Sequence, residues 1–365
     1  MHFSKHVNLA HRRLSIIDIE NGKQPMSVTI DEVTYTIVYN GQLYNTEEIR
    51  NILIENGFKF KGHSDTEVLL KAYIFYGKDV CKHLNGIFAF AIWNDKKGEI
   101  FVARDHFGIK PLYYTIIDNN FIFASEIKAI LQHPHCKPIL NKQGICELFG
   151  IGPSHTPGLS PFKGILELEP ASFIVYNREC FRKEEYWKLE TKQHTDDLEQ
   201  TCDKIRYLLK DSVEKQLVSD VPIGTLLSGG LDSSIISKYA SDYYKEKYGE
   251  KLKTFSVDYV DQEKNFVKND FQPNTDNYYI DLMVNFLGTE HKKIVLDTPE
   301  LFGSLKDAMI ARDFPGMADV DSSYLLFFQN LKKDITVTLS GECSDEIFGG
   351  YPWYFREDSL NSNTF

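Results

Sequence analysis

The sequence lacks the paired cysteines that organise metal-binding and disulfide-stabilised domains. Its six cysteines form no CxxC pair and follow no repeated spacing, which argues against both a zinc site and a disulfide framework. Reduced thiols suit a cytosolic protein. The cysteines are Cys81, Cys136, Cys146, Cys180, Cys202 and Cys343.

Long apolar runs and an excess of positive charge are also missing. No stretch reaches the roughly 18 continuous apolar residues of a membrane helix. The opening residues 1–6 lack the apolar region of a signal peptide. Lys and Arg number 41 against 52 Asp and Glu, a net charge of -11, and no basic arm is present. We therefore expect a soluble, cytoplasmic protein that binds neither membranes nor nucleic acid.

The 365 residues, 42% of them hydrophobic, are enough for two domains with their own cores. The first part alternates short β-type runs with turns, which predicts a largely antiparallel sheet. Two segments, 46–56 and 65–76, have helical spacing instead and begin with helix-start residues. A layered α+β domain follows. Its predicted strands are 35–39, 87–93, 100–104, 112–117, 121–124 and 172–176.

The second part has a different pattern. Residues 189–197 are polar and unpatterned, and a long helix follows whose apolar face holds Cys202, Ile205, Leu209, Val213 and Leu217. Strands and helices then alternate, which predicts a parallel α/β sheet. The predicted strands end near 227, 257, 296 and 339. We place the domains at 1–188 and 196–365.

The most informative string is LLSGGLDSS at 226–234, where an apolar strand runs through two glycines into a helix. Gly229 and Gly230 allow backbone amides to converge on phosphate oxygens at the positive end of that helix. Asp232 would repel a bare phosphate, so its expected role is to hold a magnesium ion. Ser233 adds a hydroxyl group. The alternative is an ordinary glycine turn with a helix cap.

A second string, LSGECSDEIFGGY at 339–351, also follows a predicted strand. It would meet the first at the carboxyl edge of the sheet, where open α/β sheets bind ligands. Cys343 within it is interpreted as a residue that serves packing or accommodates the loop, because nothing nearby in the sequence would lower its pKa.

Together the strings resemble those of glutamine-hydrolysing asparagine synthetases, whose second domain is an ATP pyrophosphatase. The resemblance implies that Glu342 is needed to form an aspartyl-adenylate and that Asp232 and Asp345 bind Mg²⁺. It also implies two parts of a nucleotide site. The AMP part would comprise Leu227, Val257, Ser340 and Gly341. The pyrophosphate loop would comprise Ser228, Gly229, Gly230, Asp232 and Ser233.

The first part resembles the same family's glutaminase, a layered N-terminal-nucleophile sandwich, from about residue 8 to 187. The matching strings are HRRLSIID, YNGQLYN, GHSDTE and RDHFGIKPLYY. By position in the family motifs, Arg13 would bind the α-carboxylate of glutamine and Asp65 would pair with its α-ammonium group. Asn40 and Gly41 would stabilise the developing oxyanion. The glutamine-binding segment as a whole would comprise Arg13, Leu14, Ser15, Ile16, Ile17, Asn40, Gly41, Gln42 and Asp65.

Three departures from the family matter. Gln42 stands where relatives often carry Glu. The family chemistry uses an N-terminal cysteine, whereas this sequence opens with Met1-His2. The synthetase part stops before a family lysine near the adenylate. We therefore expect a chain truncated in both domains, with the glutaminase step lost and the synthetase activity open.

The predicted function is that of a carbon–nitrogen ligase: adenylation of the aspartate β-carboxylate by ATP, then amidation to asparagine, AMP and pyrophosphate. Its substrates would be aspartate, ATP and either glutamine or ammonia, and its metal ion would be Mg²⁺. A homodimer is the assembly that we consider. Three alternatives stay open: a non-catalytic nucleotide-binding fragment, an adenylating enzyme of the β-lactam synthetase type, and a tRNA-modifying pyrophosphatase, which the charge disfavours.

The acidic loop at 313–323 has two interpretations. In the family this region contributes to aspartate binding. Its carboxylates are equally suited to capping the helix that follows, and capping takes the larger share.

Overall fold

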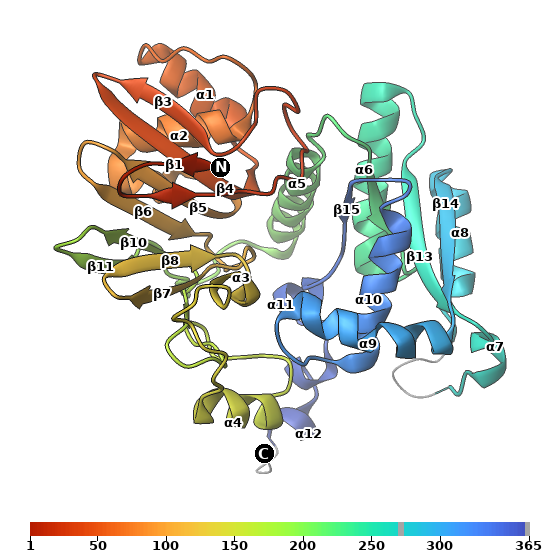
Figure 1. Ribbon diagram of the computed structural model, residues 1–365. Coiled ribbons are helices and arrows are strands. Elements are labelled where there is room, and N and C mark those ends of the chain that lie inside the picture. The colour runs from red at the N-terminus through yellow and green to blue at the C-terminus, as the bar shows by residue number, and fades with distance from the viewer. Residues whose placement is uncertain (269–273, 362–365) are drawn as a thin grey trace. The chain divides into compact units, whose positions relative to one another are not determined.

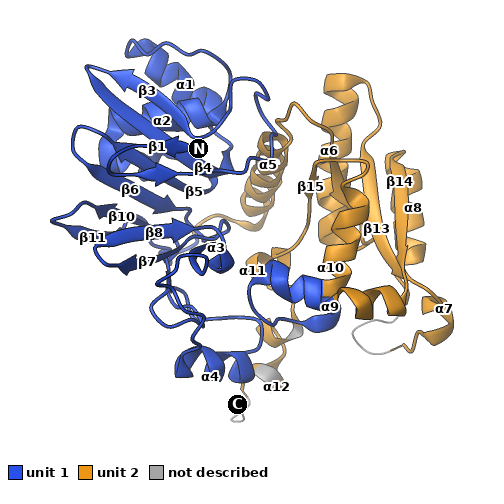
Figure 2. Cartoon of the chain, in the orientation of Figure 1, with its two compact units in different colours: residues 1–194, 305–321 blue, residues 195–304, 322–365 orange. Residues whose placement is uncertain are grey.

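The computed structural model describes residues 1–268 and 274–361, which divide into two compact units (Figure 2). Unit 1 comprises residues 1–194 and 305–321, and unit 2 comprises residues 195–304 and 322–365. Within the described ranges, no helix is long and apolar enough to cross a membrane.

Unit 1 is built on a six-stranded antiparallel sheet with the order β11-β10-β6-β5-β4-β3. Its longest pairing joins β4 to β5, from Tyr35 opposite Asn94 to Leu43 opposite Gly86. The strands are β3 (Met26–Ile30), β4 (Val33–Leu43), β5 (Gly86–Asn94), β6 (Glu99–Arg104), β10 (Ser172–Tyr176) and β11 (Phe181–Glu185).

Helices cover one face of this sheet, and a second sheet covers the other. On one face, α1 (Thr46–Glu55) and α2 (Asp65–Tyr76) bury their apolar side chains against β4, β5 and β6 (Figure 1). On the other face lie Val38, Ala91 and Val102, which pack with Leu112 and Tyr114 of the second sheet region. The second sheet has the order β8-β7-β9, with β7 (Tyr113–Ile117), β8 (Asn120–Ala124) and β9 (Leu166–Glu167).

Short elements complete unit 1. They are β1 (His2–Phe3), β2 (Asn8–Leu9), the 3-10 helix η1 (Gly77–His83), α3 (Ile127–Ile130) and α4 (Lys142–Gly150). The segment 305–321, which contains the second half of α9 (Thr298–Arg312) and the first turn of α10 (Ala318–Leu331), also belongs to this unit.

Unit 2 contains a four-stranded parallel sheet with the order β14-β13-β12-β15. Its strands are β12 (Ile223–Leu226), β13 (Lys253–Tyr259), β14 (Glu290–Leu296) and β15 (Val337–Leu339). Helices pack on both faces: α5 (Leu198–Gln216) and α6 (Leu231–Tyr248) contribute to one cluster, and α10 contributes Phe327 and Leu331 to the other.

The remaining elements of unit 2 are α7 (Gln262–Asn265), α8 (Asn277–Leu287), α11 (Ser344–Phe348), η2 (Pro352–Tyr354) and α12 (Glu357–Leu360). Local sequence explains several helix ends. Asp197 and Gln200 form a capping box at the start of α5. Gly249 and Gly288, both left-handed, end α6 and α8.

The antiparallel first sheet and the parallel second sheet are as predicted, and α2 has the predicted bounds. The face predicted for the long helix is confirmed in part, since Val213 and Leu217 are buried and Cys202, Ile205 and Leu209 are half-buried. The elements that the sequence analysis missed include β3, β11, α4 and α9. The domain boundaries at 188 and 196 stay a prediction.

Candidate nucleotide and glutamine sites

The first loop of the nucleotide site connects β12 to α6 and is held together by its own hydroxyl groups. The Ser228 amide donates to the Ser233 hydroxyl over 3.2 Å, and the two serine hydroxyls lie 3.0 Å apart. Ser233 also donates to the Gly230 carbonyl, at 3.2 Å. Ser233 is buried, and its hydroxyl shapes the loop through these hydrogen bonds.

Gly229 is required by the path of this loop. Its φ of 80° lies in the left-handed region, and an added Cβ would come within 2.8 Å of the Tyr279 Cβ on α8. The turn therefore packs tightly on one side and leaves the first-turn amides of α6 without intrahelical partners, as every helix start does. This is the arrangement that binds phosphate.

The second loop follows β15, which pairs with β12 in parallel. Both loops thus leave the sheet at the same carboxyl edge, as predicted. Gly341 touches the start of α6 directly: a Cβ added there would lie 3.0 Å from the Asp232 Cβ and from the Ser233 nitrogen. A side chain at position 341 would require these neighbours to shift by a few tenths of an ångström, so glycine favours the close approach of the two loops.

The carboxylates of Asp232 and Asp345 lie close enough to influence each other where the loops meet. Burial raises the pKa of Asp232, and the negative charge of Asp345 raises it further. A glycine at position 350 makes room for this pair, because a Cβ there would overlap the Asp345 Oδ1. Repulsion between like charges is what a bound cation would relieve.

A magnesium ion fits this pair as far as the donor set goes. Oxygen ligands are those that Mg²⁺ prefers, and it usually takes one or two carboxylates together with water and substrate phosphates. In the described parts of the chain no group of three or more His, Cys, Asp or Glu residues is arranged to hold a metal ion. The protein alone would therefore supply Asp232 and Asp345, and a nucleotide the rest.

Glu342 is presented by a sharp turn. Its amide donates to the Ser340 hydroxyl at 3.2 Å, and the next residue, Cys343, has a left-handed φ of 71°. Burial, with the charges of Glu346 and Glu342, raises the pKa of the Cys343 thiol. Nothing activates this thiol as a nucleophile, in agreement with the sequence interpretation.

The two predicted AMP contacts on neighbouring strands differ in exposure. Leu227 has only 1% of its surface exposed, and its amide donates to the Phe255 carbonyl over 2.8 Å. Val257, near the end of β13, is 37% exposed. Val257 can therefore offer its side chain to a ligand, whereas Leu227 is a packing residue of the sheet.

Unit 1 contains a cavity of about 1370 Å³ between its sheets. Eight of the nine predicted glutamine-binding residues line it, and Ser15 does not. The cavity is wider than the roughly 300–1,000 Å³ that small ligands occupy. Those eight residues are Arg13, Leu14, Ile16, Ile17, Asn40, Gly41, Gln42 and Asp65.

The charged groups of this cavity already have protein partners. Arg13 donates to the carbonyls of Ile17, at 2.5 Å, and of Asp18, at 3.0 Å. Asp65 accepts a hydrogen bond from the Tyr39 hydroxyl over 3.1 Å. Burial raises the pKa of Asp65, outweighing the hydrogen bonds it receives and the charge of Arg13. A guanidinium has five N–H donors, so Arg13 still has capacity for a carboxylate.

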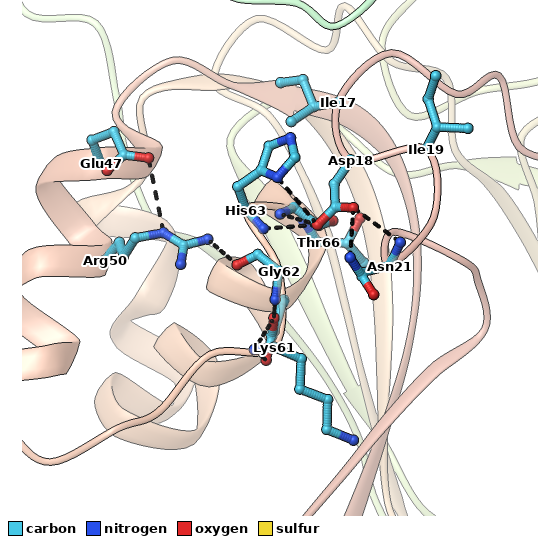
Figure 3. A network of polar contacts seen from close by, with 12 residues as sticks. Ile17, Asp18, Ile19, Asn21, Glu47, Arg50, Lys61, Gly62, His63 and Thr66 are labelled. Atoms are coloured by element: carbon cyan, nitrogen blue, oxygen red, sulfur yellow. Dashed lines mark hydrogen bonds and ion pairs between the residues drawn. The ribbon is translucent and has the colours of Figure 1, made fainter.

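Sequence reasoning missed the residue that supports both charged groups. Asp18 is 2% exposed and accepts hydrogen bonds from the Asn21 amide, at 2.9 Å, and the His63 amide, at 2.7 Å (Figure 3). Burial opposes its ionisation, yet these hydrogen bonds hold the pKa of Asp18 below its ordinary value. Asp18 thereby ties the Arg13 segment to the turn before Asp65. Its left-handed φ of 50° was not visible in the sequence.

The acidic loop before α10 makes contacts that were not predicted from the sequence. Asp313 accepts from the Ile127 amide at 2.6 Å and from the Lys128 Nζ at 3.0 Å. Arg312 donates to both carboxylate oxygens of Asp321, at 2.8 and 3.0 Å. Asp321 lies in the first turn of α10, where negative charge is favourable, but Asp313 caps α3 rather than α10.

Comparisons with known proteins agree with this geometry. A glutamine amidotransferase domain model matches residues 1–187, and an asparagine synthase model matches residues 204–365. The chain is 48% identical, over 97% of its length, to a protein of Bacillus subtilis named asparagine synthetase [glutamine-hydrolyzing] 3, and covers 58% of it. It is 36% identical over 98% of its length to asparagine synthetase 1 of the same organism, covering 54% of that chain.

A third relative, from Methanocaldococcus jannaschii, is named a putative asparagine synthetase [glutamine-hydrolyzing] 2. The identity is 34%, over 94% of this chain and 67% of the relative. The chain thus spans a little over half the length of the two Bacillus relatives.

Proposed function

We propose that this chain, which belongs to the family of glutamine-hydrolysing asparagine synthetases, activates the β-carboxylate of aspartate with ATP and converts it to an amide. The observation that carries the proposal is the contact of Gly341 with Asp232 and Ser233. It brings the first turn of α6, the carboxylates of Asp232 and Asp345, and Glu342 to one edge of a parallel sheet, which supports the proposal.

In the proposed reaction, a β-carboxylate oxygen of aspartate attacks the α-phosphorus of ATP and pyrophosphate leaves. Ammonia then attacks the acyl carbon, and AMP departs with the oxygen that joined it to the acyl group. Residues Ser228 to Ser233 hold the leaving pyrophosphate, while Ser340, Gly341 and Val257 hold AMP. Leu227 would contribute through its backbone, since its side chain is buried.

Mg²⁺, held by Asp232 and Asp345, would neutralise charge on the phosphates. Glu342 orients the reacting groups or accepts a proton from the ammonia that attacks. Both roles need an ionised carboxylate beside the acyl centre. Glu342 lies three residues beyond the end of β15 and directly follows Gly341, which lies against the start of α6.

The cavity of unit 1 is proposed to bind glutamine through Arg13, Asn40, Gly41, Gln42 and Asp65 in an N-terminal-nucleophile sandwich. All six cysteines are internal to residues 1–365, so none has a free amine beside its thiol. Ammonium and glutamine are therefore tested separately as donors. A cytoplasmic location and a homodimer stay predictions.

The alternatives have less support. Retention of Arg13, Asn40 and Asp65 around one cavity favours the asparagine synthetase side over the β-lactam-forming enzymes. A non-catalytic nucleotide-binding protein would bind magnesium–ATP without turnover.

The experiment is pyrophosphate release from magnesium–ATP with aspartate present, run with ammonium, with glutamine and with neither. Release with ammonium is the expected result, and release with glutamine as well would show that the glutamine site is active. A Glu342→Gln variant controls for contaminating ATPases. No release under any condition, with magnesium–ATP binding intact, would instead support the non-catalytic alternative.

A further inference from the structure

Tyr324 on α10 lies beside the loop that carries Glu342. Its hydroxyl donates a hydrogen bond to the Glu342 Oε2 over 3.3 Å. The two residues come from adjacent segments of unit 2, with β15 between them in the chain. Neither string that identified the nucleotide site contains Tyr324.

The tyrosine ring is held in place by its own helix. Tyr324 stacks on Phe328, one helical turn further along, with ring planes 8° apart and centroids at 5.8 Å. The buried face of α10, with Ser322 and Phe327, anchors that helix against the sheet. Its neighbour Ser323 is fixed by a 2.6 Å hydrogen bond with the Tyr259 hydroxyl. Tyr324 is 41% exposed, and the stack on Phe328 together with the hydrogen bond to Glu342 limits the directions that its hydroxyl can take.

The electrostatic surroundings make this hydroxyl a donor. The groups that act on Tyr324 are Glu342, Tyr259 and Cys343. Burial raises the pKa of Tyr324, and the charge and hydrogen bond of Glu342 raise it further. A neutral phenol beside a carboxylate donates its proton in the hydrogen bond and accepts none from it.

We propose that Tyr324 is a positioning residue that fixes the Glu342 carboxylate for the adenylation reaction. The inference deepens the proposed function and rests on the role given there to Glu342. The tyrosine holds Oε2, which leaves Oε1 to face the reacting groups. A carboxylate free to rotate about its side-chain bonds would spend only part of its time in that orientation.

The first test replaces Tyr324 by Phe, which keeps the ring stack and removes only the hydroxyl. A hydrogen bond to a charged group is worth roughly a ten- to hundredfold effect, so kcat for aspartate-dependent pyrophosphate release should fall about tenfold. The KM for ATP should change less than about twofold, because the phosphate loop is untouched. A kcat equal to that of the unmodified chain would overturn the proposal.

The matched control is Tyr244→Phe. The Tyr244 hydroxyl donates to the Ile223 carbonyl, also over 3.3 Å and also in unit 2, at the start of β12. It removes the same chemical group away from Glu342. An equal loss of kcat in both variants would mean that Tyr324 has only a structural role and would overturn the proposal.

A second measurement does not depend on turnover. In chain labelled with ¹³C at the tyrosine ζ carbon, the signal lost in Tyr324→Phe identifies Tyr324, and its titration gives the phenol pKa. Glu342→Gln should lower that pKa, since it removes a neighbouring negative charge. An unchanged pKa would refute the contact. If Glu342→Gln lowers the pKa but the unmodified chain releases no pyrophosphate, the contact between Tyr324 and Glu342 is supported. The proposed function, and the role of this pair in it, are then refuted.

Discussion

Gly341→Ala is the substitution that most directly probes the meeting of the two nucleotide loops. The new Cβ would lie 3.0 Å from both the Asp232 Cβ and the Ser233 nitrogen, and 3.1 Å from the Asp232 carbonyl carbon. These atoms belong to the backbone and to a Cβ, so no side-chain rotation relieves the clash. Gly341 does not have a positive φ, so alanine fits its backbone conformation and the clash is the cause of any effect.

Overpacking of this kind costs about 1–3 kcal/mol. If the loops separate to relieve it, magnesium–ATP binding should weaken by about five- to hundredfold. Isothermal titration calorimetry measures this, with circular dichroism to verify the fold. The matched control is Gly303→Ala in α9, where a Cβ meets nothing within 4 Å and alanine favours the helix. Unchanged ATP affinity in a folded Gly341→Ala chain would refute the close approach of the loops.

Three further predictions concern single residues. Asp313→Ala should lower the free energy of unfolding by about 1–3 kcal/mol, measured by urea denaturation, because it leaves the part-buried Ile127 amide without its acceptor; an unaltered midpoint would contradict this. The hydrogen bond from His155 to Glu167 raises the pKa of that histidine, so its stabilisation is complete below about pH 6.5 and is lost as pH rises through the raised value. In the unmodified chain the urea midpoint should therefore fall between pH 5 and pH 9, and in His155→Gln this fall should be smaller. Identical pH profiles of the two proteins would argue against the pair. Cys343→Gly should raise the free energy of unfolding by up to about 1 kcal/mol in thermal melts, since it removes a side chain from a left-handed position, and a loss of stability would show that the thiol packs usefully.

Much of the fold could be predicted because its strands carry strong local signals. Residues 86–94 are almost wholly apolar and lie in the most buried strand of unit 1. The charged strand β11, Phe181–Glu185, was missed because it lies at the edge of its sheet and most of it faces solvent. The helix α9 was missed although Thr298-Pro299 is a helix-start signal, since Gly303 interrupts its apolar spacing.

The candidate sites show the same division between local and long-range information. The glycine and acidic residues of the candidate phosphate loop could be proposed from sequence because they lie close together in the chain. The support of the Arg13 segment by Asp18 joins residues 45 positions apart in the chain, through a backbone conformation that no residue pattern encodes. The same holds for Tyr324, whose partner Glu342 lies beyond a whole strand. Asp313 reaches Ile127 across 186 positions.

The most direct test of the central claim follows one oxygen atom. Aspartate labelled with ¹⁸O in its β-carboxylate is incubated with the chain, magnesium–ATP and ammonium, and the masses of the nucleotide products are measured by mass spectrometry. Adenylation at the unit 2 site predicts AMP that has gained one ¹⁸O, together with asparagine and pyrophosphate. Unlabelled AMP, or ADP as the nucleotide product, would contradict it.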